Sequence, residues 1–201
     1  VELDGSARNT RCFSNRFTNT YATLSFQPIF GGPAYAIRNV VVNVDNEQLK
    51  FHALGGNPPK EPSGMIVLHN TFVSPARALN LQDDATSHDF LVENNLFIGP
   101  ETPENGRTVD WTGFIDNGLF DHNGYFPDGE FAFNFAGSGV VKVASFAALQ
   151  AAGVEKNGLL LPAGTCESGL VPPADYMVVV APADATLAAG ARFVAGELEW
   201  Q

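Results

Sequence analysis

Cysteine, positive charge and long hydrophobic runs are all scarce in this sequence. Two Cys among 201 residues are too few to form a disulfide-rich scaffold. The 11 Lys and Arg residues are outnumbered by 22 Asp and Glu, so the formal net charge is −11. Nucleic acid and anionic membranes both require a positive footprint, and no apolar run approaches the ~20 residues of a membrane span. We therefore expect no nucleic-acid partner and no membrane partner.

The sequence does contain enough apolar material for one folded domain, or for two very small ones. Hydrophobic residues make up 45% of the chain, with 16 Phe and a mean hydropathy of −0.01, which argues against disorder. The chain starts at Val1, in a strand-like segment without an initiator Met or a signal peptide. Either processing removed a leader or the chain is a piece of a longer reading frame, and we expect the second.

A short pattern recurs along the first two thirds of the chain: an apolar residue, two variable residues, Asn, one variable residue and an aromatic. It occurs at 12–17, 67–72, 92–97 and 120–125, with a degenerate copy at 40–45 that ends in Asp instead of an aromatic. The Asn residues of the series, at positions 15, 43, 70, 95 and 123, lie 28, 27, 25 and 28 residues apart. Fifteen of the 16 Asn precede residue 135, so the repeats should end there.

A period of 25–28 residues with short β-branched runs predicts a coil of three strands and three turns. Stacked at one corner, each Asn amide could bond the next, because rungs lie ~4.8 Å apart. The aromatic residues at 17, 72, 97 and 125 would form a second, internal stack. A leucine-rich repeat has a similar period, but its fixed Leu positions are missing. An ordinary β-sandwich with chance Asn–aromatic pairs is the alternative.

Four segments of the repeat region carry a resemblance to a known architecture. They are DGSARN at 4–9, GGPAY at 31–35 followed by Arg38 and Asn39, LHNTF at 68–72 and ENNLF at 93–97. These segments resemble right-handed parallel β-helix repeat proteins of the pectate-lyase-like superfamily, an architecture of polysaccharide-acting proteins. The resemblance covers about residues 1–135 and implies an all-β, single-stranded right-handed parallel β-helix of about five rungs. It also implies an extracellular or cell-surface protein, although a shared fold does not fix an activity.

The remaining residues, 136–201, are predicted to be irregular and to belong to the same domain. Ser145 can cap a short helix over 146–152, with Gly153 at its end. Strand-like runs follow at 159–161 and 176–180. Because open ends of a β-helix are exposed sheet edges, we expect this segment to pack on the flank or to close the C-terminal end. The N-terminal end has no visible cover, and uncapped ends could allow a homo-oligomer.

A polar stripe is predicted on the outside of the second strand of each rung, at residues 2–4, 25–27, 50–52, 80–82 and 110–112. In each strand an apolar residue separates two polar ones, so alternation turns the polar pair outward. Such a stripe spans ~19 Å and suits an extended sugar chain, although a solvated sheet face also needs polar residues. With two arginines from neighbouring turns, the candidate substrate-binding residues are Glu2, Asp4, Gln27, Arg38, Arg77, Asn80, Gln82 and Asp110.

Lys50 and His52 are the candidate catalytic residues within the stripe. The chain has only four Lys and four His, and these two lie on one face with ~6.6 Å between Cα atoms. Cleavage of a uronate polymer by β-elimination needs a base and a cation that neutralises the carboxylate. Lys50 or His52 could be the base, and Arg38 or Arg77 could hold the carboxylate. A lysine base would need desolvation or a nearby cation, because the free ammonium has a pKa near 10.4.

Acidic residues give two further readings of the sequence, each weighed against solvated turns. Hydrolysis needs two carboxylates about 5–9.5 Å apart, which Glu2 with Asp4, or Asp83 and Asp84 with Asp110, could supply. Calcium is the one cofactor these acids could hold, at 83–84 or between 116 and 121. No calcium-binding loop motif is present, so we expect no dedicated metal site. We expect no cofactor other than calcium.

The histidines before two ladder Asn residues and the first cysteine are predicted to be structural. His69 and His122 belong to rungs two apart, so they should lie ~10 Å from each other, too far to share a zinc ion. Cys12 takes an inward apolar position and is predicted to be a buried free thiol.

Two functions therefore follow from the sequence. The first is a polysaccharide-active protein, in its most concrete form a lyase that uses the face of Lys50 and His52. The second is a non-catalytic carbohydrate-binding or structural β-helix module of a larger surface protein.

Overall fold

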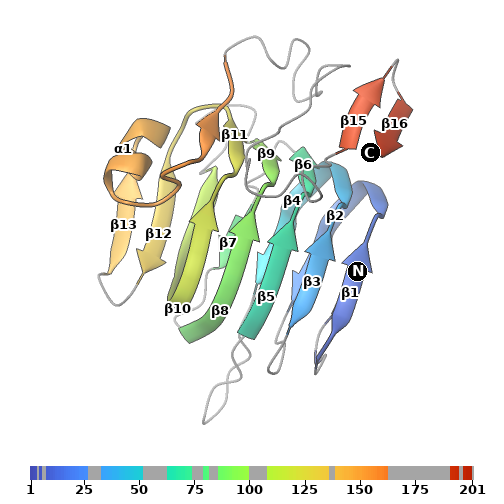
Figure 1. The fold of residues 1–201 in the computed structure, drawn as a ribbon, viewed down its shortest axis with the longest axis horizontal. Coiled ribbons are helices and arrows are strands. Elements are labelled where there is room, and N and C mark those ends of the chain that lie inside the picture. The colour runs from blue at the N-terminus through green and yellow to red at the C-terminus, as the bar shows by residue number, and fades with distance from the viewer. Residues whose placement is uncertain are drawn as a thin grey trace.

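The chain winds as a single-stranded right-handed parallel β-helix, shown in Figure 1 as rows of aligned strands. The computed structural model describes residues 1–3, 5, 8–26, 33–51, 63–73, 79–81, 86–99, 108–135, 139–162, 191–194 and 197–200. The parallel pairings fall into three sheets, here called I, II and III in the order the chain visits them after residue 9. This confirms the predicted fold class and excludes the β-sandwich.

Each sheet takes one stretch from every rung. Sheet I contains β1 (Thr10–Phe13), β3 (Ala34–Ile37), β5 (Ser63–Leu68), β8 (Thr86–Glu93) and the second part of β10 (Val109–Asp121). Sheet II contains the first parts of β2 (Arg16–Phe26) and β4 (Val40–Phe51), then β6 (Thr71–Val73), β9 (Leu96–Ile98), β11 (Gly124–Phe126) and β14 (Leu159–Leu160). Sheet III contains the second parts of β2 and β4, β7 (Leu79–Leu81), the first part of β10 and β12 (Phe131–Phe135).

Residues in the left-handed region turn the chain at the corners. The corner between sheets I and II has one such residue in every rung, with φ from +54° to +58°: Ser14, Arg38, His69, Asn94 and His122. The long strands also bend where Asn lies in this region, at Asn19, Asn43 and Asn117. Asn tolerates a positive φ better than most residues, which explains part of the Asn richness of the repeats.

A ladder of Asn side chains, buried in every rung after the first, follows each corner between sheets I and II. The Oδ1 atom of each Asn accepts hydrogen bonds from the backbone N and the Nδ2 of the Asn one rung before, at 2.9–3.1 Å. The members are Asn15, Asn39, Asn70, Asn95 and Asn123. The predicted ladder is thus confirmed at four of its five positions.

The assignment of Asn43 to the ladder is wrong, and Asn39 takes its place. Asn43 is exposed and donates from Nδ2 to Asn19 Oδ1 at 2.6 Å, on the far side of sheet II. Asn39 is fully buried, and Val41, two residues later, lies opposite Phe17 and Phe72 in the aromatic position. The error arose because Asn43 fits an even repeat spacing, whereas the numbers of residues between the actual ladder Asn residues are uneven.

The predicted internal aromatic stack holds for three of its four residues. Phe72 and Phe97 stack with ring centroids 5.2 Å apart, and Phe97 and Tyr125 stack at 5.4 Å. Phe17 is separated from this stack, because Val41 fills the rung between it and Phe72. Aromatic pairs of this kind add about 0.5–1.5 kcal/mol beyond their buried area.

The C-terminal end of the coil is closed by α1 (Phe146–Ala151) and by β13 (Val140–Val143), which pairs antiparallel with β12 (Figure 1). The Ser145 side chain accepts from Ala148 N, and Gly153 has φ +94°, so the predicted helix and its stop are confirmed. Phe146 packs against the Tyr125 and Phe131 rings. β15 (Ala191–Val194) and β16 (Glu197–Trp200) pair with each other, and the predicted strand at 176–180 lies outside the described residues.

Candidate functional site

The register of sheet III aligns the polar positions predicted from the sequence. Ser25 lies opposite Glu2 on one side and Lys50 on the other, Lys50 lies opposite Asn80, and Asn80 lies opposite Asp110. We call these five residues the polar stripe. Their neighbours in the strands, such as Phe26 and Trp111, are fully buried in the core. The stripe therefore lies on the outer side of sheet III, one residue in each rung.

The outer side of sheet III is not an open surface, although its residues are polar. Thr23, Gln48 and Ala132 all alternate outward, yet each is at most 2% exposed. Ser25 is 8% exposed, and Lys50 is half-buried. A flat, solvated sheet face would leave these side chains in water. The polar stripe thus runs along a largely covered side of the coil.

Arg38 lies away from Lys50. It occupies the corner between sheets I and II, whereas Lys50 lies in sheet III, with the whole of sheet II between them along the chain. Arg38 and His69 occupy this corner in successive rungs, and Arg38 N donates to Leu68 O at 3.1 Å. Burial and, to a lesser extent, the charge of Arg38 lower the pKa of His69. The structure therefore does not bring Arg38 to the predicted catalytic lysine.

The other predicted residues are described in part or not at all. Glu2 is exposed at the start of the stripe. Asn80 and Asp110 are described through their backbone only. Outside the described residues lie Asp4, Gln27, His52, Arg77, Gln82, Asp83 and Asp84.

The predicted calcium ligands at 116 and 121 have separate surroundings. The Asp121 carboxylate accepts from His122 N, Asn157 N and Asn157 Nδ2 at 2.7–2.9 Å. Asp116 lies at the other end of the same stretch of β10, with Oδ2 3.7 Å from His88 Nδ1. Among the residues that the structure describes, no three His, Cys, Asp or Glu side chains are grouped so as to hold a metal ion.

The structural roles predicted for Cys12 and the two histidines fit their surroundings. Cys12 is a free thiol, 6% exposed, whose Sγ accepts from Asn15 Nδ2 at 3.3 Å, and burial raises its pKa. A thiol with a raised pKa is a poor nucleophile. His69 and His122 both take the left-handed corner position. His69 is buried, and His122 Nε2 lies 4.0 Å from Asp121 Oδ2.

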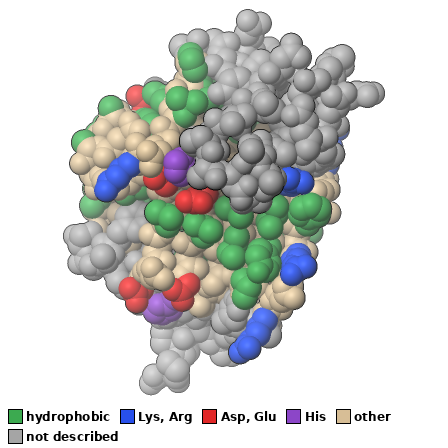
Figure 2. Space-filling view, viewed as in Figure 1, with side chains coloured by type: hydrophobic (Ala, Val, Ile, Leu, Met, Phe, Trp, Pro, Cys, Tyr) green, Lys and Arg blue, Asp and Glu red, His purple; other side chains and the backbone are tan. Residues whose placement is uncertain are grey.

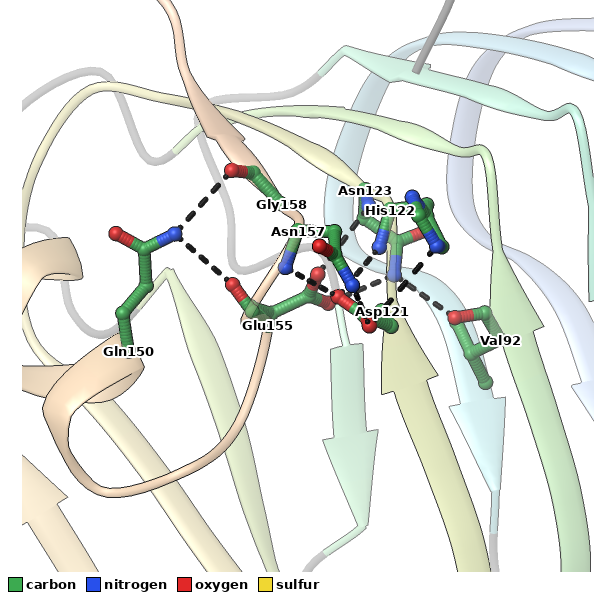
Figure 3. Close-up of polar contacts among 8 residues, drawn as sticks. All are labelled: Val92, Asp121, His122, Asn123, Gln150, Glu155, Asn157 and Gly158. Carbon is green, nitrogen blue, oxygen red and sulfur yellow. Dashed lines mark hydrogen bonds and ion pairs between the residues drawn. The ribbon is translucent and has the colours of Figure 1, made fainter. Parts of the chain in front are cut away.

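A buried carboxylate that the sequence did not reveal ends the Asn ladder (Figure 3). Glu155 is 1% exposed and accepts from Asn123 Nδ2 and Tyr125 OH at 2.7 Å and from Asn123 N at 3.2 Å. Burial raises the pKa of Glu155 to about 7, against the lowering effect of these hydrogen bonds. Gly158 makes room for it, since a Cβ there would meet Glu155 Oε2 at 2.6 Å. No repeat spacing leads to this residue, because the chain detours through α1 before reaching it.

The outer side of sheet I carries a second unpredicted feature, an exposed apolar surface that we call the platform. In register order its two rows are Tyr35, Ile66, Leu91, Leu119 and Phe13, Ile37, Leu68. Phe13 is 53% exposed and Leu119 is 49% exposed. Figure 2 shows hydrophobic side chains gathered across the middle of this face. The signal was in the strands themselves, which are apolar on both faces, a pattern usually read as doubly buried.

Charges flank the platform and divide by sign along the helix axis. The first two rungs carry the basic residues Arg8, Arg11 and Arg38, and the guanidinium of Arg11 lies 5.4 Å from the centroid of the Tyr35 ring. The last two rungs of the sheet carry the acidic residues Asp89, Glu93, Asp116 and Asp121. In Figure 2 the basic side chains line the right-hand border, and the acidic ones lie toward the left.

Comparison with known proteins adds no assignment: no family model, no curated protein and no solved structure matches this chain. Within the described part of the chain, no helix has the length and apolarity needed to cross a membrane.

Proposed function

We propose that this chain binds an oligosaccharide or polysaccharide along the polar stripe of sheet III. The observation that carries the proposal is the register that stacks Glu2, Ser25, Lys50, Asn80 and Asp110 one per rung. A row of hydroxyl, amide and charged groups spaced ~4.8 Å apart matches the repeated polar groups of an extended sugar chain. Glu2 is exposed and Lys50 is only half-buried, so both side chains are accessible to a ligand.

The finer form of the proposal is β-elimination on a uronate-containing polymer. Lys50 or His52 would remove the proton next to the carboxylate, and Arg77 would neutralise that carboxylate. A carbon–carbon double bond then forms as the neighbouring glycosidic carbon–oxygen bond breaks, and the leaving oxygen takes a proton from water. Arg38 is not part of this arrangement, because it lies at the corner between sheets I and II, away from Lys50 in sheet III.

A second candidate function is a non-catalytic structural module of a larger extracellular or surface protein. The observation that favours it is that Thr23, polar and directed outward from sheet III, is 2% exposed and shares a hydrogen bond of 2.7 Å with Thr20 Oγ1. Polar groups buried inside a protein are normally satisfied there, so they need no sugar to bind.

A paired binding and cleavage experiment separates these functions. The full chain is titrated with polygalacturonate, alginate and a neutral glucan by calorimetry, and unsaturated product is followed by its ultraviolet absorbance across pH and calcium. Lys50→Ala is compared with Lys156→Ala, which changes an exposed lysine between α1 and β14, outside sheet III. We expect Lys50→Ala alone to weaken binding and, for a lyase, to abolish product formation.

Each result of that experiment has one meaning. Binding without product formation supports a carbohydrate-binding module and excludes a lyase. Full activity in Lys50→Ala removes Lys50 as the base. No binding of any of the three polymers, by a chain whose circular dichroism shows it is folded, leaves the structural module.

A further inference from the structure

The platform on sheet I is an exposed apolar surface, of the kind through which proteins contact a partner. Five described strands contribute to it, and Phe13 and Leu119, at its opposite ends, are each about half exposed. Contiguous apolar patches of this kind mark interaction sites on soluble proteins. A shallow hollow at its lower border is lined by Pro33, Gly64, Ile66, Leu91, Asn117 and Leu119.

The charges at the platform are complementary to themselves when one copy is reversed. Arg8 and Arg11 lie in the first rung and Arg38 in the second, whereas Asp89 and Glu93 lie in the fourth and Asp116 and Asp121 in the fifth. The middle rung presents the apolar side chains of Ile66 and Leu68 from β5. One end of the platform is therefore basic, the other is acidic, and the centre is apolar.

We propose that two copies of this chain associate face to face through their platforms, with their helix axes antiparallel. A two-fold axis along the central strand β5 places the first rung of one copy over the fifth rung of the other. Arg8 of one copy then faces Asp116 of the other, and Arg38 of one copy comes next to Glu93 of the other. The contact is isologous, because each residue pair occurs twice around the axis.

Other occupants of the platform fit its charges less well. Two copies with parallel axes would oppose acidic rung to acidic rung and basic rung to basic rung, and like charges juxtaposed across an interface are costly. An anionic membrane or a polyanion would be repelled by the acidic half. Reversal of one copy is the arrangement in which both halves meet their opposite charge.

The size of the platform predicts a weak, reversible dimer. Five strands ~4.8 Å apart and about six residues along each strand give a footprint of about 400 Å² per copy. Stable interfaces bury about 800 Å² per partner. The contact is therefore smaller than that of an obligate dimer, and the net charge of −11 on each copy opposes it further at low salt.

Sedimentation of the full chain over micromolar to millimolar concentration tests the dimer. Ile66→Lys places two ammonium groups against each other at the two-fold axis, and we expect it to weaken association about tenfold or more. Leu159→Lys is the matched control, because Leu159 is 46% exposed on β14, outside the platform. A chain that stays monomeric at all concentrations, or a dimer that Ile66→Lys does not weaken, overturns the proposal.

Charge reversal tests the antiparallel orientation and keeps the proposal falsifiable if Ile66→Lys fails to fold. One variant carries Arg8→Glu alone, and the second adds Asp116→Arg to the same chain. We expect Arg8→Glu to weaken the dimer and the double variant to restore it, because with antiparallel axes the introduced carboxylate faces the introduced guanidinium of the other copy. With parallel axes each introduced charge would face its own counterpart, so a double variant that stays monomeric overturns the antiparallel arrangement.

This inference is independent of carbohydrate binding, because the two surfaces lie on different sheets. Lys50→Ala should leave the dimer unchanged, and Ile66→Lys should leave sugar binding unchanged. Failure of one proposal is therefore distinguishable from failure of the other.

Discussion

On the outer side of sheet III polar side chains are buried, whereas on the outer side of sheet I large apolar side chains are exposed. Gln48 is 0% exposed and Ser25 8%, while Phe13 is 53% and Leu119 49% exposed. Alternation along a strand tells which side chains leave the core, but it does not tell whether the outer side meets water. Polarity on a β-helix therefore does not by itself identify the face that is open to water.

The largest effect that tests this comparison is a charge introduced on each outer side. Ala132→Glu places a carboxylate at a fully buried outward position of sheet III, and we expect a loss of about 4 kcal/mol of unfolding free energy. Leu91→Glu makes a similar change on the half-exposed outer side of sheet I, and we expect it to cost less than about 1 kcal/mol. Urea unfolding at low protein concentration measures both.

Equal losses in the two variants would contradict the contrast between the faces. Ala132→Ser is the control for sheet III, since it adds one hydroxyl oxygen without a charge and should fall between the two.

The next effect concerns Glu155 at the end of the Asn ladder, which makes the free energy of unfolding depend on pH. The folded protein raises the pKa of this carboxyl from 4.5 to about 7 through burial, so the folded state binds its proton more tightly than the unfolded state. The stabilisation is complete below pH 4.5 and is lost as the pH rises through 7. The raised pKa corresponds to about 3 kcal/mol of unfolding free energy.

Glu155→Gln removes the ionisation and keeps an acceptor for Asn123 Nδ2 and Tyr125 OH. Unfolding curves at several pH values should then lose the decline between pH 4.5 and 7 that the unsubstituted chain shows. A decline of the same size in both chains would assign the pH dependence to other groups.

The smallest expected effect is a change in the pKa of His69, which tests whether Arg38 lies on the sheet I side of the molecule. Burial and then the Arg38 charge lower the pKa of His69, so Arg38→Gln should raise that pKa while leaving it below 6.5. Arg16→Gln, an exposed change on sheet II, is the matched control and should leave it unchanged. Proton NMR titration of the His69 ring measures both, and an unchanged midpoint in Arg38→Gln would place the guanidinium elsewhere.

Much of the coil could be predicted because the repeat acts locally. Asn70, Asn95 and Asn123 each sit three residues after an inward apolar residue and two before an aromatic, so the spacing alone places them at one corner. The register of the polar stripe followed from the same period. The Ser145 cap and the Gly153 stop depend on neighbours within a few residues.

The failures share a physical cause, which is that they depend on contacts between distant rungs. Asn39 and Asn43 both flank the same valine run, and only burial against Asn15 and Asn70 selects the first. Glu155 reaches the ladder after the α1 detour, so its role depends on Asn123 and Tyr125 rather than on spacing. The platform was missed because apolar strands are usually covered on both sides.

Period and alternation are properties of a short stretch of chain, so they are enough to predict the coil, the Asn corner and the pairing of polar positions in sheet III. Contacts between rungs are needed to establish which outer side is covered, where the ladder ends and how charge divides across sheet I. Those properties arise when residues some 25–30 positions apart are stacked ~4.8 Å from one another.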